Sequence, residues 1–205
     1  MRDLYFSSII DSFGEATTSR YVSPEHITKW KTILPDNLLD CWVNEGWSSY
    51  QYGLFSFVNP SLYKDVVLEW LDGTHLIEID NFYVIAISGF GDLYLFGERY
   101  GFICRILARY GIIETLSQIN KVSQEERNRH IYQIFQTINK KNLDPADIFL
   151  SLVKKHGELN DNEIYCFEPS IQKLEKPNFI ASKRVNTIDY LLALRKLITP
   201  VINFI

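Results

Sequence analysis

Gly89, Gly91 and the adjoining Asp92 form the stretch of this sequence that most invites a search for ligand chemistry. Loops that cradle phosphate groups also carry a third glycine or a Lys-Ser/Thr pair and lead into a helix, and none of these features is present here. We therefore predict a tight turn between two strands, because glycine adopts the positive φ angle of such a turn without steric cost. The Asp92 carboxylate could bind a ligand, or it could accept hydrogen bonds from the amides of the turn, which is the role we favour.

The histidines, cysteines and paired carboxylates form no catalytic or metal-binding pattern. No histidine has a second histidine or a carboxylate at a ligand spacing, and no Cys-x-x-Cys pair could hold zinc or exchange disulfides. There is no Gly-x-Ser-x-Gly elbow and no His-Glu-x-x-His helix. We therefore predict no catalytic residues, no metal and no cofactor, and a protein that is not an enzyme. The residues considered are His26, His75, His130, His156, Cys41, Cys104, Cys166, Glu125, Glu126, Asp144 and Asp147.

The composition indicates a globular protein with a large core. Hydrophobic residues make up 46% and aromatic residues 14% of the 205 residues, which suffices for one large domain or two small ones. A formal net charge of -4 argues against a protein that binds nucleic acid directly. The longest apolar run, residues 82–87, is far shorter than the ~20 residues that a membrane-spanning helix needs, and the first residues do not resemble a signal peptide. We therefore expect a cytoplasmic protein that does not contact a membrane.

Helices with clear start and stop signals are predicted in the first part of the chain. Ser23-Pro24 and Asn59-Pro60 each combine a capping side chain with a proline suited to the first helical turn. Asp36 offers a further cap, and Gly46 supplies a stop. The predicted helices cover residues 4–13, 23–33, 36–45 and 60–72, and an aromatic strand covers residues 49–58.

A β-meander is predicted between residues 75 and 116, where short apolar segments alternate with glycine-containing turns. In the alternating segment 92–96, the two leucines should lie on one face of the sheet and the two aromatic residues on the other. These residues are Leu93, Leu95, Tyr94 and Phe96.

The pattern becomes helical after residue 121. Ser123 and Glu126 have the spacing of a capping box. Helices are predicted at residues 123–138, 144–157 and 186–197, with a short apolar segment at 164–167 and a turn of helix around 171–174. The predicted fold class is α+β, with N-terminal helices packed on a mostly antiparallel sheet and a helical C-terminal part. We divide the chain into an α+β domain of residues 1–118 and a helical region of residues 119–205, packed together as one compact unit.

Several of these motifs, in their order and spacing, resemble the bacterial GAD-like domain. They are residues 27–30, 34–39, Trp42, Gly46-Trp47, residues 52–55, 58–60, Tyr63, Trp70-Leu71 and residues 86–96. Phe96 departs from the family pattern, in which a tryptophan is expected. Residues 167–197 resemble the C-terminal domain of Tdi-type type VI secretion immunity proteins. The Leu-Pro helix, the Gly-Trp turn and the aromatic strand that follows are also similar to the wider SMI1/KNR4-like superfamily.

The resemblance implies an immunity protein, which binds a secreted bacterial toxin and neutralises it in the producing cell. In the Tdi case the effector is often one that degrades DNA, so the implied partner is a basic nuclease domain. The family offers no catalytic residue to transfer. Aromatic residues would anchor such a contact and carboxylates would meet the basic face of the toxin. The candidate contact residues are Glu45, Trp47, Tyr50, Asp72, Glu78 and Asp80.

Other interpretations stay open at this point. For Trp47 and Tyr50 the alternative that we favour is a place in the core, since aromatic side chains are often buried. The protein could also be an adaptor or regulatory module that binds a protein or a small ligand through the turn at Gly91 and Asp92. The protein could also be an enzyme of unrecognised type. Turnover of a substrate that Asp92→Ala abolishes would support this interpretation.

Overall fold

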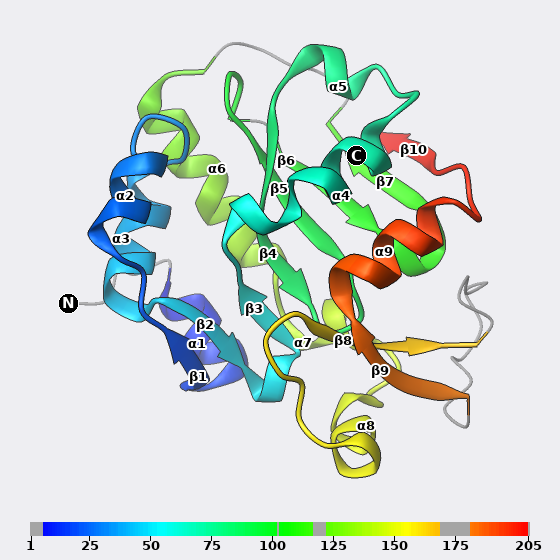
Figure 1. Ribbon diagram of the computed structural model, residues 1–205. Helices are drawn as coiled ribbons and strands as arrows, with labels where there is room; N and C mark the ends of the chain where they lie inside the picture. The colour runs from blue at the N-terminus through cyan, green and yellow to red at the C-terminus, as the bar shows by residue number, and fades with distance from the viewer. Residues whose placement is uncertain (1–5, 102, 117–121, 169–180, 205) are drawn as a thin grey trace.

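The computed structural model describes residues 6–101, 103–116, 122–168 and 181–204. It is an α+β protein whose main sheet has the strand order β1-β2-β3-β4-β5-β6-β7-β10 (Figure 1). Neighbouring strands of this sheet are antiparallel, except that β10 runs parallel to β7. Strands β8 and β9 form a separate antiparallel pair. The strands are β1 (Ala16–Arg20), β2 (Trp47–Tyr50), β3 (Phe55–Phe57), β4 (Phe82–Ser88), β5 (Leu93–Gly97), β6 (Ile103–Leu107), β7 (Ile112–Thr115), β8 (Glu163–Phe167), β9 (Ser182–Asn186) and β10 (Val201–Phe204).

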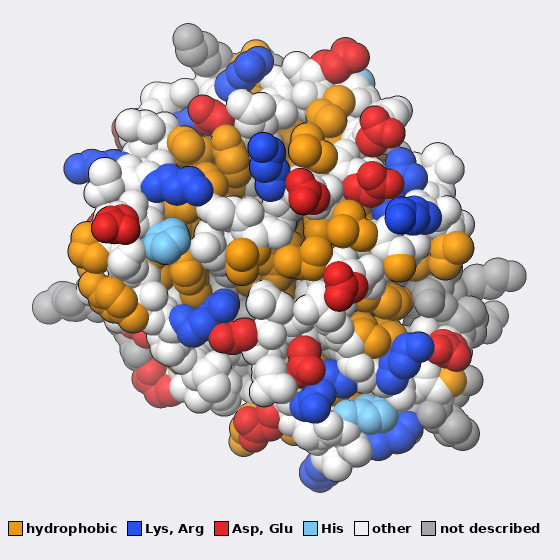
Figure 2. Space-filling model, in the orientation of Figure 1, with side chains coloured by type: hydrophobic (Ala, Val, Ile, Leu, Met, Phe, Trp, Pro, Cys, Tyr) orange, Lys and Arg blue, Asp and Glu red, His pale blue; other side chains and the backbone are white. Residues whose placement is uncertain are grey.

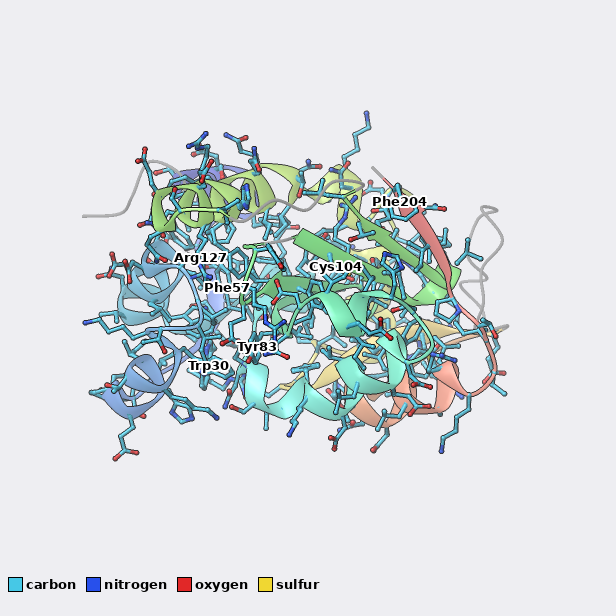
Figure 3. The ribbon with its side chains drawn as sticks, turned by 90° about the horizontal axis from the view of Figure 1, so that it is seen from above. Trp30, Phe57, Tyr83, Cys104, Arg127 and Phe204 are labelled. Carbon is cyan, nitrogen blue, oxygen red and sulfur yellow. The ribbon has the colours of Figure 1, made fainter. Side chains whose placement is uncertain are left out.

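Helices cover both faces of the main sheet. Figure 3, a view from above, shows α6 on one side of the sheet and α4 and α9 on the other. The α-helices are α1 (Ser7–Phe13), α2 (Pro24–Trp30), α3 (Asp36–Glu45), α4 (Lys64–Leu71), α5 (Leu76–Ile79), α6 (Gln124–Thr137), α7 (Lys140–Leu143), α8 (Phe149–His156) and α9 (Thr187–Arg195). Short 3-10 helices are η1 (Gln51–Gly53), η2 (Pro60–Tyr63) and η3 (Ala108–Tyr110).

The two faces of the sheet carry two different cores. The core beneath α1, α2, α3, α6 and α8 is rich in aromatic rings and includes Tyr94 and Phe96. The core beneath α4, α5 and α9 is mostly aliphatic and includes Leu93 and Leu95. The predicted alternation along this segment is therefore confirmed, because successive side chains of a strand point to opposite faces.

The predicted helix starts are confirmed where a side chain caps the backbone. The Ser23 side chain accepts from the amide of His26, and the Asn186 side chain accepts from the amide of Asp189. Both halves of the capping box at Ser123 are present. These caps involve residues close together in the chain, so the sequence alone displays them.

The predicted strand at residues 49–58 is wrong as a single element. Tyr52 has a φ angle of 61°, in the left-handed region, and the 3-10 helix η1 turns the chain back on itself. The segment is therefore two antiparallel strands, β2 and β3. Left-handed backbone is rare for a bulky residue, so the local sequence does not predict this turn.

The C-terminal part contains strands as well as helices. β8 pairs with β9, and β10 extends the main sheet beside β7. The sequence does not predict strands β1, β9 and β10, and the predicted turn of helix around residues 171–174 lies outside the described residues. Within the described residues, no helix has both the length and the apolar character needed to cross a lipid bilayer.

Candidate binding groove

A groove of about 450 Å³ opens between α2 and α4, where the helices of one face of the sheet meet those of the other. Its walls come from α2, η2, α4 and α5, and the first residues of β4 close it from below. Most of its lining is apolar. The lining residues are Lys29, Trp30, Ile33, Pro60, Ser61, Lys64, Val67, Leu68, Leu71, Ile77, Asp80, Asn81, Phe82 and Tyr83.

Trp30 and Tyr83 form an aromatic contact in the wall of the groove. Their ring centroids lie 5.1 Å apart and the planes meet at 72°, an edge-to-face arrangement. Figure 3 shows the two side chains next to each other, between α2 and α4. Trp30 is 3% exposed, so it belongs to the core as well as to the groove.

Tyr83 is held in place by a carboxylate. Its hydroxyl donates to Oε2 of Glu98 at 2.9 Å, and Asn81 Nδ2 donates to the same oxygen at 3.0 Å. Burial, the hydrogen bond to Glu98 and the negative charges of Glu98 and Asp80 raise the pKa of Tyr83 to about 12. Tyr83 is therefore a neutral hydroxyl at physiological pH, fixed in orientation.

Two lysines stand at the rim of the groove. Lys29 Nζ donates to Ser61 Oγ at 2.7 Å and lies 5.1 Å from the centroid of the Trp30 ring, which joins α2 to η2. Lys64 is exposed at the start of α4. Within the described part of the chain, neither ammonium group forms an ion pair with a carboxylate.

Aliphatic side chains extend the apolar surface beyond the groove. Leu68 on α4 is 46% exposed and Ile77 on α5 is 40% exposed, and both line the opening. Asp72 and Glu78, both exposed, follow them in the chain. Figure 2 shows hydrophobic side chains among charged ones of both signs on the face that carries α2, α4 and α5. We call Leu68, Ile77, Asp72 and Glu78 the α4–α5 surface.

Three of the six candidate contact residues are buried, and Trp47 and Tyr50 lie in the core, as the favoured interpretation of these two residues expects. Trp47 is 8% exposed and packs edge-on against Trp42 at 5.9 Å, and Tyr50 is fully buried against Phe55 at 5.9 Å. Asp80 is 4% exposed. Its carboxylate accepts three backbone N–H groups, from Asn81 at 2.7 Å, Arg99 at 2.8 Å and Tyr100 at 3.1 Å.

The other three predicted contact residues do not form one cluster in the chain. Asp72 and Glu78 belong to the α4–α5 surface. Glu45 ends α3 and is half-buried, and its carbonyl oxygen accepts hydrogen bonds from the hydroxyls of Ser19 and Ser48. Of these three residues, only Asp72 and Glu78 follow groove-lining residues closely in the chain.

Asp92 is buried within the turn, and its hydrogen bonds there differ from the predicted ones. It is 3% exposed, and its Oδ2 accepts from Arg109 Nη2 at 2.9 Å and from Ser88 Oγ at 3.2 Å. The amides of Phe90 and Asp92 donate to Ser88 Oγ at 3.3 and 3.0 Å, so the serine binds the turn amides in place of the aspartate. The predicted tight turn is present, with Gly91 at a φ angle of 86°.

The described residues contain no group of three or more His, Cys, Asp or Glu placed to hold a metal ion. All three cysteines are buried. Burial raises the pKa of the Cys104 thiol to about 12 and also raises the pKa of Cys166, so neither thiol is a nucleophile in the folded protein.

Sequence reasoning did not find the groove. Its walls come from three separate segments, residues 29–33, 60–71 and 77–83, and most of their apolar side chains fit equally well on the core faces of helices. The sequence offers one indication of the groove, which is the charged Lys29 next to the aromatic Trp30 in the motif that resembles the GAD-like domain.

Comparisons with known proteins identify the family and the fold. The family model of the GAD-like domain matches residues 4–110, a span that includes every residue lining the groove. The crystal structure of Atu4351 from Agrobacterium tumefaciens is similar, with a TM-score of 0.76 and 18% sequence identity, over 93% of this chain and 88% of that chain. A search of curated proteins returned no match. The chain belongs to the GAD-like domain family.

Proposed function

We propose that this protein works by binding another protein, and that the partner is a toxin secreted by a type VI-type system, which it neutralises in the cytoplasm of the producing cell. The observation that carries this proposal is the α4–α5 surface. Leu68 and Ile77 are exposed beside an apolar groove, and the exposed Asp72 and Glu78 follow them in the chain. An apolar centre within a polar rim is the usual anatomy of a protein–protein interface.

Sequence resemblance supports the choice of a toxin as partner. Residues 167–197 resemble the C-terminal domain of Tdi-type immunity proteins, and the motifs before residue 96 resemble the GAD-like domain. Tdi-type effectors are often nucleases that degrade DNA. We propose a basic nuclease domain as the target, because Asp72 and Glu78 would attract its positive face and speed the encounter.

Inhibition would then follow from occupancy alone. A protein that covers the active site of a nuclease needs a well-packed apolar anchor and no reacting group of its own. Leu68 and Ile77 supply two such anchors at the edge of a groove that could receive a side chain of the partner.

The proposal is tested by co-expressing the chain with the effector encoded beside it. Cells should survive, and the two proteins should co-purify. Leu68→Asp and Ile77→Asp should each weaken binding about 30-fold, the equivalent of ~2 kcal/mol for a central interface residue. Leu150→Asp on α8 is the matched control, because Leu150 is 42% exposed and does not line the groove.

The control variant should protect cells as well as the unchanged protein does. Circular dichroism would verify that all three variants are folded. If folded Leu68→Asp and Ile77→Asp protected cells fully, the α4–α5 surface would not be the interface. If the unchanged chain neither bound the effector nor protected cells from it, the immunity function itself would be refuted.

A further inference from the structure

We propose that the groove between α2 and α4 is a binding site for a small apolar molecule with an anionic head group, such as a medium-chain or aromatic carboxylate. This inference goes beyond the proposed function, because it concerns a free ligand and not the partner protein. It depends on the size of the groove, on its lining and on the charge of its rim.

The size and lining of the groove suit a small molecule. Ligand pockets in proteins measure roughly 300–1,000 Å³ and combine apolar walls with a few polar groups. This groove measures about 450 Å³, within that range. Val67, Leu71 and Phe82 line it although each is at most 7% exposed, so they form a recessed wall. A flat protein surface would not reach such a wall, whereas a narrow alkyl or aryl group would.

The rim of the groove is cationic. An ammonium group carries three donors, and Lys29 is shown to use one of them, on Ser61 Oγ at 2.7 Å. Lys64 stands on the same rim. The described residues place no carboxylate in an ion pair with either lysine. The carboxylate of Asp80, which also lines the groove, is occupied by backbone amides. Two lysines that form no ion pair with a described carboxylate, placed at the mouth of an apolar groove, complement an apolar anion.

Two side chains with polar atoms, Trp30 and Tyr83, also line the groove. The Trp30 indole Nε1–H is buried and has no acceptor among the described residues, which is uncommon for a buried donor. Tyr83 is fixed beside it as a neutral hydroxyl, with its proton directed to Glu98. The groove therefore has an aromatic wall, and the carboxylates of Asp80 and Glu98 beside it are engaged in hydrogen bonds with protein groups.

The test is a titration of the 205-residue chain with decanoate, measured by calorimetry and by the NMR signal of the Trp30 indole N–H. Trp30→Phe assigns that signal. Decanoate should bind saturably below its micelle concentration, at least about 10-fold more tightly than the uncharged decanol, and should shift the Trp30 signal. Replacing both rim lysines, Lys29→Met with Lys64→Met, should remove this preference of about 10-fold while leaving decanol binding unchanged.

The matched control removes two lysines elsewhere. Lys141→Met with Lys154→Met changes the net charge equally, and both of these side chains are exposed on α7 and α8. This control should keep the preference for decanoate. The proposal would be overturned by equal affinities for decanoate and decanol, by binding that leaves the Trp30 signal unmoved, or by an absence of saturable binding.

The result is independent of the immunity function. The rim variants and the unchanged protein can be compared for toxin binding in the assay described above. A chain that binds decanoate at the groove but protects no cell would refute the proposed function alone, and a chain that protects cells but binds no apolar anion would refute this inference alone.

Discussion

The carboxylate of Asp92 and the guanidinium of Arg109 lie 2.9 Å apart inside the protein, with 4% and 11% of their side chains exposed. Arg109 also lies over the rings of Phe90 at 4.7 Å and Tyr110 at 5.0 Å, and it donates to the carbonyl oxygen of Leu143 at 3.3 Å. One buried cation therefore links the start of β5, η3 and the end of α7. Burial disfavours its charged form, but Asp92 and the neighbouring tyrosines outweigh this effect and raise the pKa of Arg109.

Breaking this pair should lower the stability of the protein substantially. Asp92→Ala leaves a buried positive charge without its partner, and such changes typically lower the free energy of unfolding by about 3–5 kcal/mol. The double variant Asp92→Ala with Arg109→Met removes both charges and should recover part of the loss. Urea denaturation of the three proteins measures this. Equal stability of Asp92→Ala and the unchanged protein would contradict the description of a buried pair.

Replacing Asp80 should destabilise the protein much more than replacing Asp72. Asp80→Ala removes the acceptor of three backbone amides and should lower the free energy of unfolding by roughly 3 kcal/mol. Asp72→Ala changes an exposed residue and should alter stability by less than about 0.5 kcal/mol, while it slows association with a basic partner. Thermal melts separate the two variants. A destabilised Asp72→Ala together with an unaffected Asp80→Ala would show that their roles are reversed.

The sequence predicts those features whose cause is local. The helix starts at Ser23, Ser123 and Asn186 depend on side chains that cap amides within the next few residues, and all three are present. The face alternation in β5 follows from the two-residue period of a strand. Such features need no knowledge of the rest of the chain.

The failures come from partners distant in the sequence. The sequence predicts Asp80 as a surface contact residue and Asp92 as a turn carboxylate. In the structure the buried Asp80 accepts from the amide of Arg99, and the buried Asp92 accepts from the guanidinium of Arg109. Strand β10 has mostly exposed side chains, and it is a strand because its backbone pairs with the edge strand β7. The groove likewise forms only when α2 and α4 meet, so its residues carry no common signature in the sequence.

The three cysteines should resist modification in the folded protein. All are buried, Cys104 is completely so, and its pKa is raised to about 12 by burial. A thiol reagent at about pH 8 should therefore label none of them until urea unfolds the chain, after which all three should react. Mass spectrometry counts the labels. Rapid labelling of Cys104 in the native protein would show that the aliphatic core opens readily.

Stability should fall at high pH through Tyr83. Its folded-state pKa of about 12 lies above the ordinary value of 10.0, so the folded protein holds this proton more tightly than the unfolded chain does. The contribution is complete below pH 10.0 and is lost as the pH rises toward 12. Tyr83→Phe removes this part of the pH dependence. Urea denaturation of both proteins on either side of this interval should show a smaller loss for the variant, and identical losses would contradict the assignment.

The most direct test of the central claim is a titration of the cognate toxin's activity with increasing amounts of this protein. A chain that acts by occupying its target should reduce toxin activity linearly to zero at a fixed stoichiometric ratio, and Leu68→Asp should shift that titration to higher concentrations. Complete inactivation by a small fraction of the stoichiometric amount would mean that the protein turns over, and would contradict an account based on binding alone.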